Sequence, residues 1–253
     1  NFNKMKVIFI SHLHGDHYLG LFGLISTMSL LGRKKALHII GPIGLKEIIS
    51  VQLKYSGTII SYPLTLDEIT AEKSLDVYES DLISVKTIPL IHRVPTRGYL
   101  FTEKTKERKL NTDIAPPYLT PNQIRTLKRG EDVTMSDGTI FLSKDLTFEP
   151  APIRSYAYCS DTKYNEAIIP LIKGCSLLYH ESTFLDNLAD RAEYTQHSTA
   201  KQAATIALKA KVKKLIIGHF SARYTDLTPL LDEAKTVFEN VELAEEGLTF
   251  KII

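Results

Sequence analysis

Four side chains that can bind a metal ion lie within six residues near the start of this 253-residue chain. They are His12, His14, Asp16 and His17. They follow the apolar run 7–10, which predicts a buried strand. Two histidines separated by one residue can point into one cleft at the end of a strand. The aspartate and the third histidine can then face a second position a few ångströms away. Imidazole nitrogens with a carboxylate oxygen suit zinc, with manganese or iron as weaker candidates.

The same pattern, a short apolar strand followed by a histidine or an aspartate, recurs later in the chain. It recurs at His92, Asp161, His180 and His219. In a layered α/β fold such strand ends can converge on one edge of the sheets. Any one of these residues alone could be an ordinary polar strand terminus. Together they supply donors for two metal ions if one carboxylate is shared.

The composition is that of an ordinary globular chain, with 43% hydrophobic residues and a formal charge of +2. No apolar stretch approaches the roughly 20 residues that span a bilayer, so no membrane partner is expected. The only cysteines, Cys159 and Cys175, provide no disulfide framework and favour a reducing cytoplasmic compartment. The net charge is too small to indicate a nucleic-acid partner, and no DNA partner is expected.

Strands and helices alternate along the predicted chain, which indicates α/β layering. Strands are predicted at 37–42, 58–62, 82–88, 155–159, 176–179, 212–218 and 248–252. Helices are predicted at about 18–31, 43–53, 165–172, 199–209 and 227–238, with Ser198 as the N-cap of the fourth. Gly15 is expected to let the backbone turn tightly inside the metal motif.

Residues 103 to about 150 differ in composition from the rest of the chain. The segment is rich in Lys and Arg, and prolines interrupt any long helix. The cations are Lys104, Lys106, Arg108, Lys109, Arg125, Lys128 and Arg129, opposed mainly by Glu103, Glu107 and Asp113. Ser136-Asp137-Gly138 predicts a hairpin turn. The segment is either a solvated insertion or a basic arm that binds a polyanion.

The motif His-x-His-x-Asp-His at residues 12–17 resembles the signature of the metallo-β-lactamase superfamily. The later motifs resemble those of one branch, the ribonuclease Z family of tRNA 3′-processing endonucleases. These motifs are His92-Arg93 with Gly98-Tyr99, Ser160-Asp161-Thr162, His180-Glu181-Ser182-Thr183, His197-Ser198-Thr199 and His219-Phe220-Ser221-Ala222-Arg223-Tyr224. The resemblance implies the metallo-β-lactamase fold, an αβ/βα four-layer sandwich, as a single catalytic domain over residues 1–253 with the arm inserted.

Two parts of the chain depart from the family pattern. In the family, strands and a loop containing Pro, Arg and Asn precede the metal motif, whereas this chain starts at Asn1 and reaches its motif at once. We therefore expect N-terminal strands to be missing from this chain. The arm keeps Leu127-Lys128-Arg129-Gly130 but carries Tyr118-Leu119 after its proline pair, in place of the usual Gly-Pro-rich pattern.

The resemblance also implies roles for individual residues. One Zn²⁺ would be held by His12, His14, His92 and Asp161, and a second by Asp16, His17, His219 and the shared Asp161. Asp16 would accept the proton of the nucleophile, and His197, oriented by Glu181, would protonate the leaving ribose oxygen. Arg223 would contact phosphate. The alternatives are that His197 and Glu181 simply pair at a helix start and that Arg223 pairs with a local acid.

The function implied is zinc-dependent removal of the 3′ trailer of precursor tRNA, which leaves a 3′-hydroxyl on the tRNA and a 5′-phosphate on the trailer. The family is also expected to be homodimeric, with the arm cations of one subunit holding the RNA that the other cuts. Two alternatives stay open: a small-molecule metallohydrolase or phosphodiesterase of the same superfamily, and a non-catalytic RNA-binding scaffold.

Overall fold

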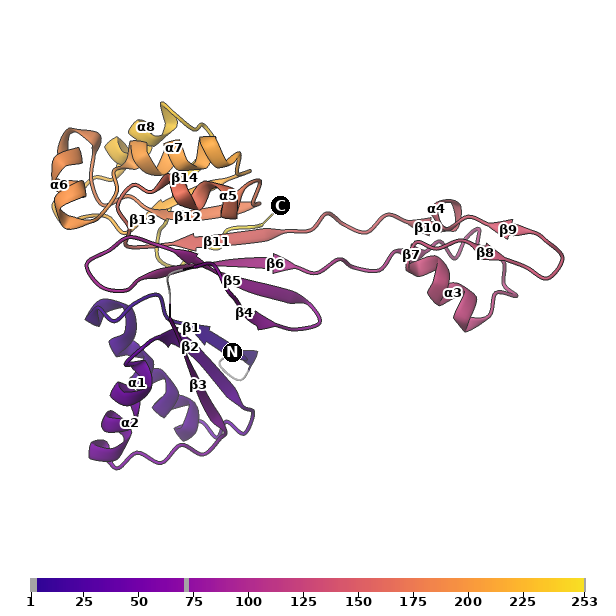
Figure 1. Ribbon diagram of the computed structural model, residues 1–253, viewed down its shortest axis with the longest axis horizontal. Helices are drawn as coiled ribbons and strands as arrows, with labels where there is room; N and C mark the ends of the chain where they lie inside the picture. The colour runs from indigo at the N-terminus through magenta and orange to yellow at the C-terminus, as the bar shows by residue number, and fades with distance from the viewer. Residues whose placement is uncertain (1–3, 71–72, 253) are drawn as a thin grey trace. The chain divides into compact units, whose positions relative to one another are not determined.

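A computed structural model describes residues 4–70 and 73–252 of the chain, which divides into two compact units (Figure 1). Unit 1 comprises Asn1–Thr102 and Arg154–Ile253. Unit 2 comprises Glu103–Ile153, close to the bounds predicted for the arm. No helix within the described ranges is long and apolar enough to cross a membrane.

The first part of unit 1 is a parallel sheet with two helices on one face. Its strands, in spatial order, are β1 (Val7–Phe9), β2 (Leu37–Pro42) and β3 (Leu64–Ile69). The helices are α1 (Gly15–Leu30) and α2 (Leu45–Ser56). Ile25 and Met28 of α1 and Ile49 of α2 are buried in one cluster with Ile39 of the central strand. This apolar cluster holds the metal motif, which links β1 to α1, in place.

The second part of unit 1 is a seven-stranded sheet in the order β14-β13-β12-β11-β6-β5-β4. Its strands are β4 (Asp76–Glu79), β5 (Ile83–Pro89), β6 (Arg97–Glu103), β11 (Ser155–Cys159), β12 (Leu177–Glu181), β13 (Leu215–Gly218) and β14 (Val241–Leu243). The segments that accompany it are η2 (Glu166–Ile168), α5 (Ile169–Ile172), η3 (Asp186–Leu188), α6 (Ala189–Thr195), α7 (Ala200–Ala210) and α8 (Thr228–Lys235). Strands β11 to β14 run parallel, as connections through helices require.

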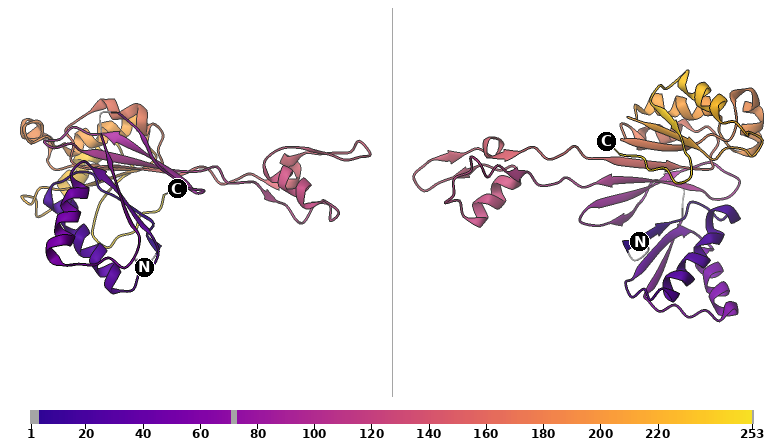
Figure 2. Two further views of the ribbon diagram at one scale, coloured as in Figure 1. Left: turned by 60° about the horizontal axis from the view of Figure 1, so that its bottom comes forward. Right: turned by 180° about the vertical axis from the view of Figure 1, so that it is seen from behind.

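The two sheets face each other, and the helices cover their outer faces (Figure 2). The ring of Phe9 on β1 lies 5.1 Å from that of Tyr99 and 5.2 Å from that of Phe101, both on β6. The Tyr99 hydroxyl also donates to the carbonyl of Ile10 at 2.7 Å. The predicted αβ/βα layering is confirmed.

Several predicted elements are wrong. Residues 58–62 and 248–252 are not strands, whereas the strands β3, β4, β6 and β14 were not predicted. Tyr62 looked like a strand residue because it is apolar and buried. Its burial instead comes from packing under α1, where its hydroxyl donates to the carbonyl of Ile25 at 2.9 Å. The neighbouring Ser61 amide donates to Ser29 Oγ at 2.9 Å rather than to a sheet partner.

Two further predictions differ in local chemistry. Gly15 is the first residue of α1, so the motif enters a helix directly instead of making a tight turn there. Thr199, not Ser198, is the N-cap of α7, and it forms a capping box with Gln202. The Ser198 hydroxyl is used elsewhere, because it donates to the carbonyl of Thr162 at 2.7 Å.

Gly98 on β6 is required by a close approach of two backbones. A Cβ atom there would lie 2.3 Å from the Tyr158 carbonyl oxygen of the paired strand. We expect Gly98→Ala to lower the free energy of unfolding by about 1–3 kcal/mol or more, since the two strands must separate. The matched control is Gly20→Ala in α1, where an added Cβ meets nothing within 4 Å. That variant should gain about 0.5–1 kcal/mol. Urea titration of both variants tests the contrast, which would be refuted if both changed stability equally.

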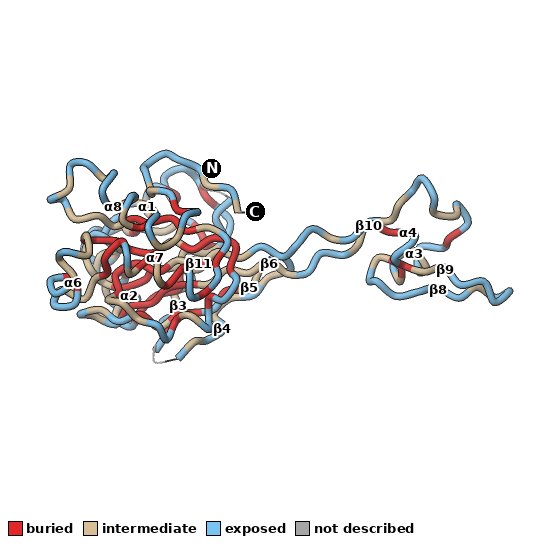
Figure 3. Tube along the Cα trace, turned by 90° about the horizontal axis from the view of Figure 1, so that it is seen from above, coloured by how far each residue is buried: buried red, intermediate tan, exposed pale blue. Residues whose placement is uncertain are grey.

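Unit 2 has a small core of its own, built from Leu119, Leu127, Val133 and Leu146 (Figure 3). Its elements are β7 (Lys109–Leu110), α3 (Pro121–Lys128), β8 (Val133–Thr134), β9 (Ile140–Phe141), α4 (Ser143–Leu146) and β10 (Thr147–Phe148). Strands β8 and β9 form a hairpin whose turn has Gly138 at φ +88°, as the Ser-Asp-Gly turn predicts.

Candidate metal centre

The predicted ligands come together where strands of both sheets end. His12 and His14 follow β1, and Asp16 and His17 lie in the first turn of α1. The other three, His92, Asp161 and His219, follow β5, β11 and β13. These residues lie in the segments that directly follow the strands, which is where the sites of open α/β sheets form.

One group of four donors surrounds a single point. His14 Nδ1 lies 3.1 Å from His12 Nε2 and 3.3 Å from His92 Nε2. Asp161 Oδ2 lies 3.7 Å from His12 Nε2 and 3.8 Å from His92 Nε2. A tetrahedron with metal–nitrogen distances of 2.0–2.1 Å has edges of about 3.3–3.4 Å, so these spacings fit a zinc-sized ion.

A second group of donors adjoins the first through Asp161. It contains Asp16, His17 and His219. His17 Nε2 lies 3.5 Å from Asp16 Oδ2 and 3.4 Å from Asp161 Oδ1. His219 Nε2 lies 3.4 Å from Asp161 Oδ2. One buried carboxylate therefore faces both groups, which is the arrangement that a shared ligand requires.

Hydrogen bonds to the ring nitrogens that face away from the donor groups fix the orientation of these histidines. His92 Nδ1 donates to the carbonyl of Gln196 at 3.0 Å, which leaves Nε2 unprotonated and turned toward the other donors. His12 Nδ1 contacts Ser11 Oγ at 3.0 Å, and His219 Nδ1 contacts Thr183 Oγ1 at 2.9 Å. Such outer partners orient metal-binding histidines and set their tautomer.

The surroundings of the donor groups favour the protonation states in which histidine and aspartate bind a metal ion. Burial lowers the pKa of His12 to about 4 and also lowers the pKa of His92. Both rings are therefore neutral at pH 7, as metal ligation requires. Burial alone would raise the pKa of Asp161, but the facing His219 and the Ser160 hydroxyl hold it below its ordinary value, so Asp161 stays ionised.

Backbone strain is concentrated here. Asp161 and His219 have φ values of 59° and 60°, in the left-handed region that residues with a Cβ avoid. Gln196, whose carbonyl orients His92, has φ 59°. Such conformations cost of order 1–3 kcal/mol each and cluster at functional sites. They turn the side chains that follow β11 and β13 toward the donor groups.

His197 and Glu181 form a separate pair beside the donors. His197 Nδ1 lies 2.8 Å from Glu181 Oε1. The buried Glu181 also accepts from the Thr162 and Ser198 amides at 2.7 and 2.9 Å and from the Thr183 hydroxyl at 2.7 Å. Burial disfavours the charged form of His197, but Glu181 outweighs it and raises the pKa of His197 above its ordinary value.

A cleft of about 330 Å³ joins these groups, lined by side chains of both donor groups and by His197. Its lining includes Arg93 and Phe184, to which the sequence alone assigned no role. The position of Arg93 directly after a ligand candidate was a usable signal, whereas nothing near Phe184 in the sequence marked it. Arg223 stacks over the Phe184 ring at 5.0 Å and donates to Ser221 Oγ at 3.1 Å, so its observed partners are a ring and a hydroxyl rather than an acid.

Two histidines stand apart from the donor groups. His180 on β12 is fully buried, with its Nδ1 2.8 Å from the carbonyl of Glu181, and it belongs to none of the metal-sized groups among the described residues. It is a polar strand terminus. His38 on β2 pairs with Asp67 at 2.7 Å, away from the donor groups.

The predicted RNA-binding cations of unit 2 are balanced by acids. Unit 2 contains eight Lys and Arg residues and eight Asp and Glu residues, so its formal charge is zero and the predicted basic excess is wrong. Arg108 pairs with Glu149 at 2.6 Å and Lys128 with Glu107 at 2.9 Å. Arg129 and Lys106 pair with Glu131 and Glu103. Arg125, Lys128 and Arg129 lie together on α3 and its C-cap, where Lys128 and Arg129 each pair with one acid.

Comparison with known proteins places this chemistry in a family. A family model described as the beta-lactamase superfamily domain matches residues 1–151. The chain is 51% identical to ribonuclease Z of Cytophaga hutchinsonii over 94% of this chain and 76% of that protein. It is 44% identical to ribonuclease Z of Bacteroides thetaiotaomicron over 99% of this chain and 80% of that protein.

Solved structures agree on the fold. The crystal structure of the short form of human tRNase Z superposes with a TM-score of 0.68 at 24% identity, covering 100% of this chain and 81% of that one. The metallo-beta-lactamase fold protein YhfI from Bacillus subtilis superposes with a TM-score of 0.63 at 18% identity, covering 98% of this chain and 78% of that one. The chain has the metallo-β-lactamase fold and belongs to the ribonuclease Z family of the beta-lactamase superfamily.

Proposed function

We propose that this protein is a zinc-dependent endoribonuclease that removes the 3′ trailer of precursor tRNA. The products are a 3′-hydroxyl on the tRNA and a 5′-phosphate on the trailer. One observation carries the proposal: Asp161 faces two groups of metal donors, which lie beside a histidine held by a buried carboxylate. The ribonuclease Z relatives supply the substrate class.

The donor chemistry fits two Zn²⁺ ions. His12, His14, His92 and Asp161 would hold one ion, and Asp16, His17, His219 and Asp161 the other. Bound zinc lowers the pKa of a coordinated water toward roughly 7 and stabilises negative charge on phosphoryl oxygens.

Asp16 is the exposed carboxylate of the set and faces the cleft. It is placed to accept the proton of an attacking water.

His197 has the features of a proton donor for the leaving ribose oxygen. Its Nδ1 is engaged by Glu181, so its Nε2 is the atom free to meet substrate in the cleft. Glu181 raises the pKa of His197, which favours the protonated ring that a general acid needs. Arg93 in the cleft, and Arg223 stacked on Phe184 beside it, would hold phosphate groups on either side of the bond.

Mapping the products of a precursor tRNA tests the function. The protein should cut between the 3′ end of the tRNA and its trailer and leave the two termini stated above. A chelator should stop the reaction, and zinc should restore it. Cleavage elsewhere in the tRNA, or cleavage of small phosphodiesters alone, would contradict the proposal.

We propose that unit 2 is the tRNA-binding arm. Because Thr102 pairs with Ser155 across β6 and β11, a two-residue Asn-Gly turn can replace the arm without breaking the sheet. Precursor-tRNA cleavage should then fall at least roughly 100-fold, as expected when several phosphates of the tRNA are no longer bound. Zinc content and hydrolysis of bis(p-nitrophenyl) phosphate should be unchanged. Equal loss on both substrates would make unit 2 a scaffold.

A finer variant separates local charge from arm structure. Replacing Arg125, Lys128 and Arg129 with Gln leaves the arm core in place. The variant should bind tRNA more weakly. The slope of the logarithm of its binding constant against the logarithm of the salt concentration should become shallower by about one for each phosphate that these side chains neutralise.

We also propose a homodimer located in the cytoplasm. Exposed apolar side chains on α1 and α2, including Leu30 at 87% and Tyr55 at 81% exposure, offer a surface that a partner subunit would bury. The two buried, unpaired cysteines suit a reducing compartment. Light scattering of the purified protein gives the subunit number.

A further inference from the structure

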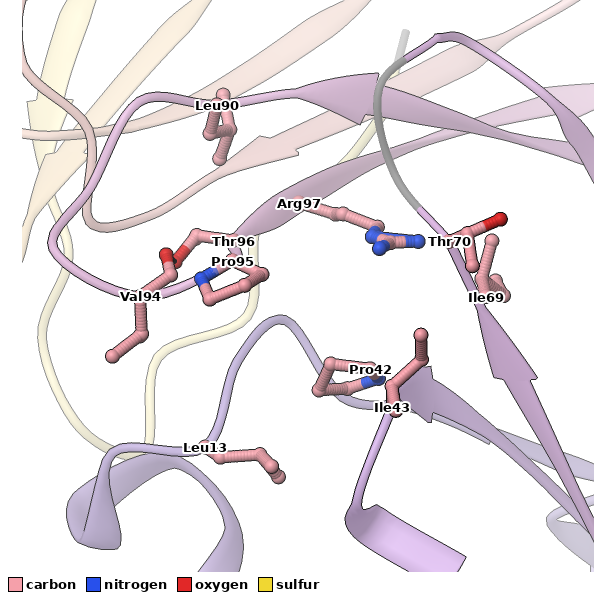
Figure 4. Close-up of a pocket in the computed structure, with 10 residues that line it drawn as sticks. All are labelled: Leu13, Pro42, Ile43, Ile69, Thr70, Leu90, Val94, Pro95, Thr96 and Arg97. Carbon is pink, nitrogen blue, oxygen red and sulfur yellow. Dashed lines mark hydrogen bonds between the residues drawn. The ribbon is translucent and has the colours of Figure 1, made fainter.

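A second cavity in unit 1, of about 580 Å³, lies behind the loops that carry the metal ligands (Figure 4). Leu13, which stands between His12 and His14, lines it, and so do Leu90 and Val94 on either side of His92. The remaining walls come mainly from apolar side chains at the ends of β2 and β3, such as Pro42 and Ile69. Its size and lining are those of a small-molecule site.

One charged group projects into this apolar space. Arg97, the first residue of β6, extends its guanidinium toward Ile69 and Thr70 (Figure 4). The side chain is only 2% exposed, and its Nε and Nη1 atoms have no hydrogen-bond partner among the residues that the structure describes. A buried charge without a partner is costly, so native folds supply an acceptor for it.

The same protein shows how it satisfies a buried arginine when the role is structural. Arg33 is 1% exposed, and its Nε donates to the carbonyl of Lys35 at 2.7 Å. Its Nη2 donates to the carbonyls of Met5 and Ala36, both at 2.7 Å. Nε and Nη1 of Arg97 have no such acceptors within the described ranges, although the side chain is buried to the same degree. An acceptor carried by a ligand in the cavity would supply what these two atoms lack among the described residues.

We propose that this cavity binds a small monocarboxylate with an apolar body, whose carboxylate pairs with the Arg97 guanidinium. Arg97 is the only charged residue that lines the cavity within the described part of the chain. One positive charge is neutralised by one carboxylate, whereas a phosphate dianion would leave excess negative charge against apolar walls. The guanidinium fork also matches the two oxygens of a carboxylate.

Titration of the zinc-loaded full chain with decanoate, followed by calorimetry, tests the site directly. Decanoate should bind with one-to-one stoichiometry and raise the melting temperature. Decanol, which has the same chain without the charge, and decyl phosphate should bind at least about 10-fold more weakly. Arg97→Met should lower decanoate affinity about 10- to 100-fold, the range for a charge-assisted hydrogen bond. Equal binding of decanoate to both proteins, or equal binding of decanol to the wild type, would overturn the proposal.

Stability without ligand provides a second test that does not depend on the choice of probe. Arg97→Met removes a buried charge whose Nε and Nη1 have no partner among the described residues, so its melting temperature should be unchanged or higher than that of the wild type. Arg33→Met, the matched control, breaks the hydrogen bonds to the carbonyls of Lys35, Met5 and Ala36 and should melt about 5 °C or more below it. If the melting temperature of Arg97→Met fell as far as that of Arg33→Met, the chain itself would supply the counter-charge of Arg97. The proposal would then be wrong.

Discussion

Asp161→Asn should abolish precursor-tRNA cleavage and strip the protein of most of its metal. Oδ2 of this carboxylate lies within 3.8 Å of His12, His92 and His219, and its Oδ1 within 3.4 Å of His17. Among the described residues, no other acid of the site contacts histidines of both donor groups. The amide keeps the shape of the side chain but removes the negative charge that both ions would share.

The expected loss of metal affinity exceeds roughly 100-fold, because removing even an outer hydrogen-bond partner of a metal ligand costs 10- to 100-fold. Metal content at a buffered free-zinc concentration, together with single-turnover cleavage, measures the two effects. Asp67→Asn is the matched control, since Asp67 also contacts a histidine, His38, but lies outside the centre. It should retain both metal and activity. An Asp161→Asn protein that keeps its zinc would remove Asp161 from the ligand set.

His197→Ala should lower kcat by roughly 10²–10⁴-fold, the range expected for a general acid, and leave zinc content unchanged. His197 is held by Glu181 at 2.8 Å and is not needed to complete either of the two proposed ligand sets. A precursor whose last tRNA nucleotide carries a 3′-bridging sulfur at the scissile bond has a better leaving group and should recover much of the lost rate. Such a leaving group departs as a stable anion, so the reaction no longer depends on a general acid.

Glu181→Gln separates positioning from proton donation. It keeps one acceptor for His197 but removes the charge that raises the pKa of His197. We expect a smaller loss than for His197→Ala, with its pH–rate profile shifted toward acid. His38→Ala is the matched histidine control and should retain full kcat. If His197→Ala loses zinc together with activity, His197 is a ligand, a role that its place near Asp161 and His219 allows.

The order of strands and helices could be predicted where the chain carries clear local signals. Apolar runs such as 37–42 became strands, and the Ser136-Asp137-Gly138 turn became a hairpin. Errors arose where burial comes from tertiary packing rather than from a sheet, as at Tyr62, whose hydroxyl bonds under α1. Strand β3, with its mixed sequence LTLDEI, carries no strong periodic signal, and only its pairing with β2 defines it.

The sequence by itself determined which residues can carry the chemistry, because donor types and spacing are properties of the chain. Residues from the ends of four different strands had to meet before they could form a site. Only the tertiary structure decided that Asp161 faces both groups while His180, on the neighbouring strand, turns away into the core. The difference depends on side-chain direction at a strand end and on the left-handed φ of Asp161, neither of which leaves a signal in composition or spacing. The buried guanidinium of Arg97 is a similar case, since the burial of a charge is a property of the surrounding fold.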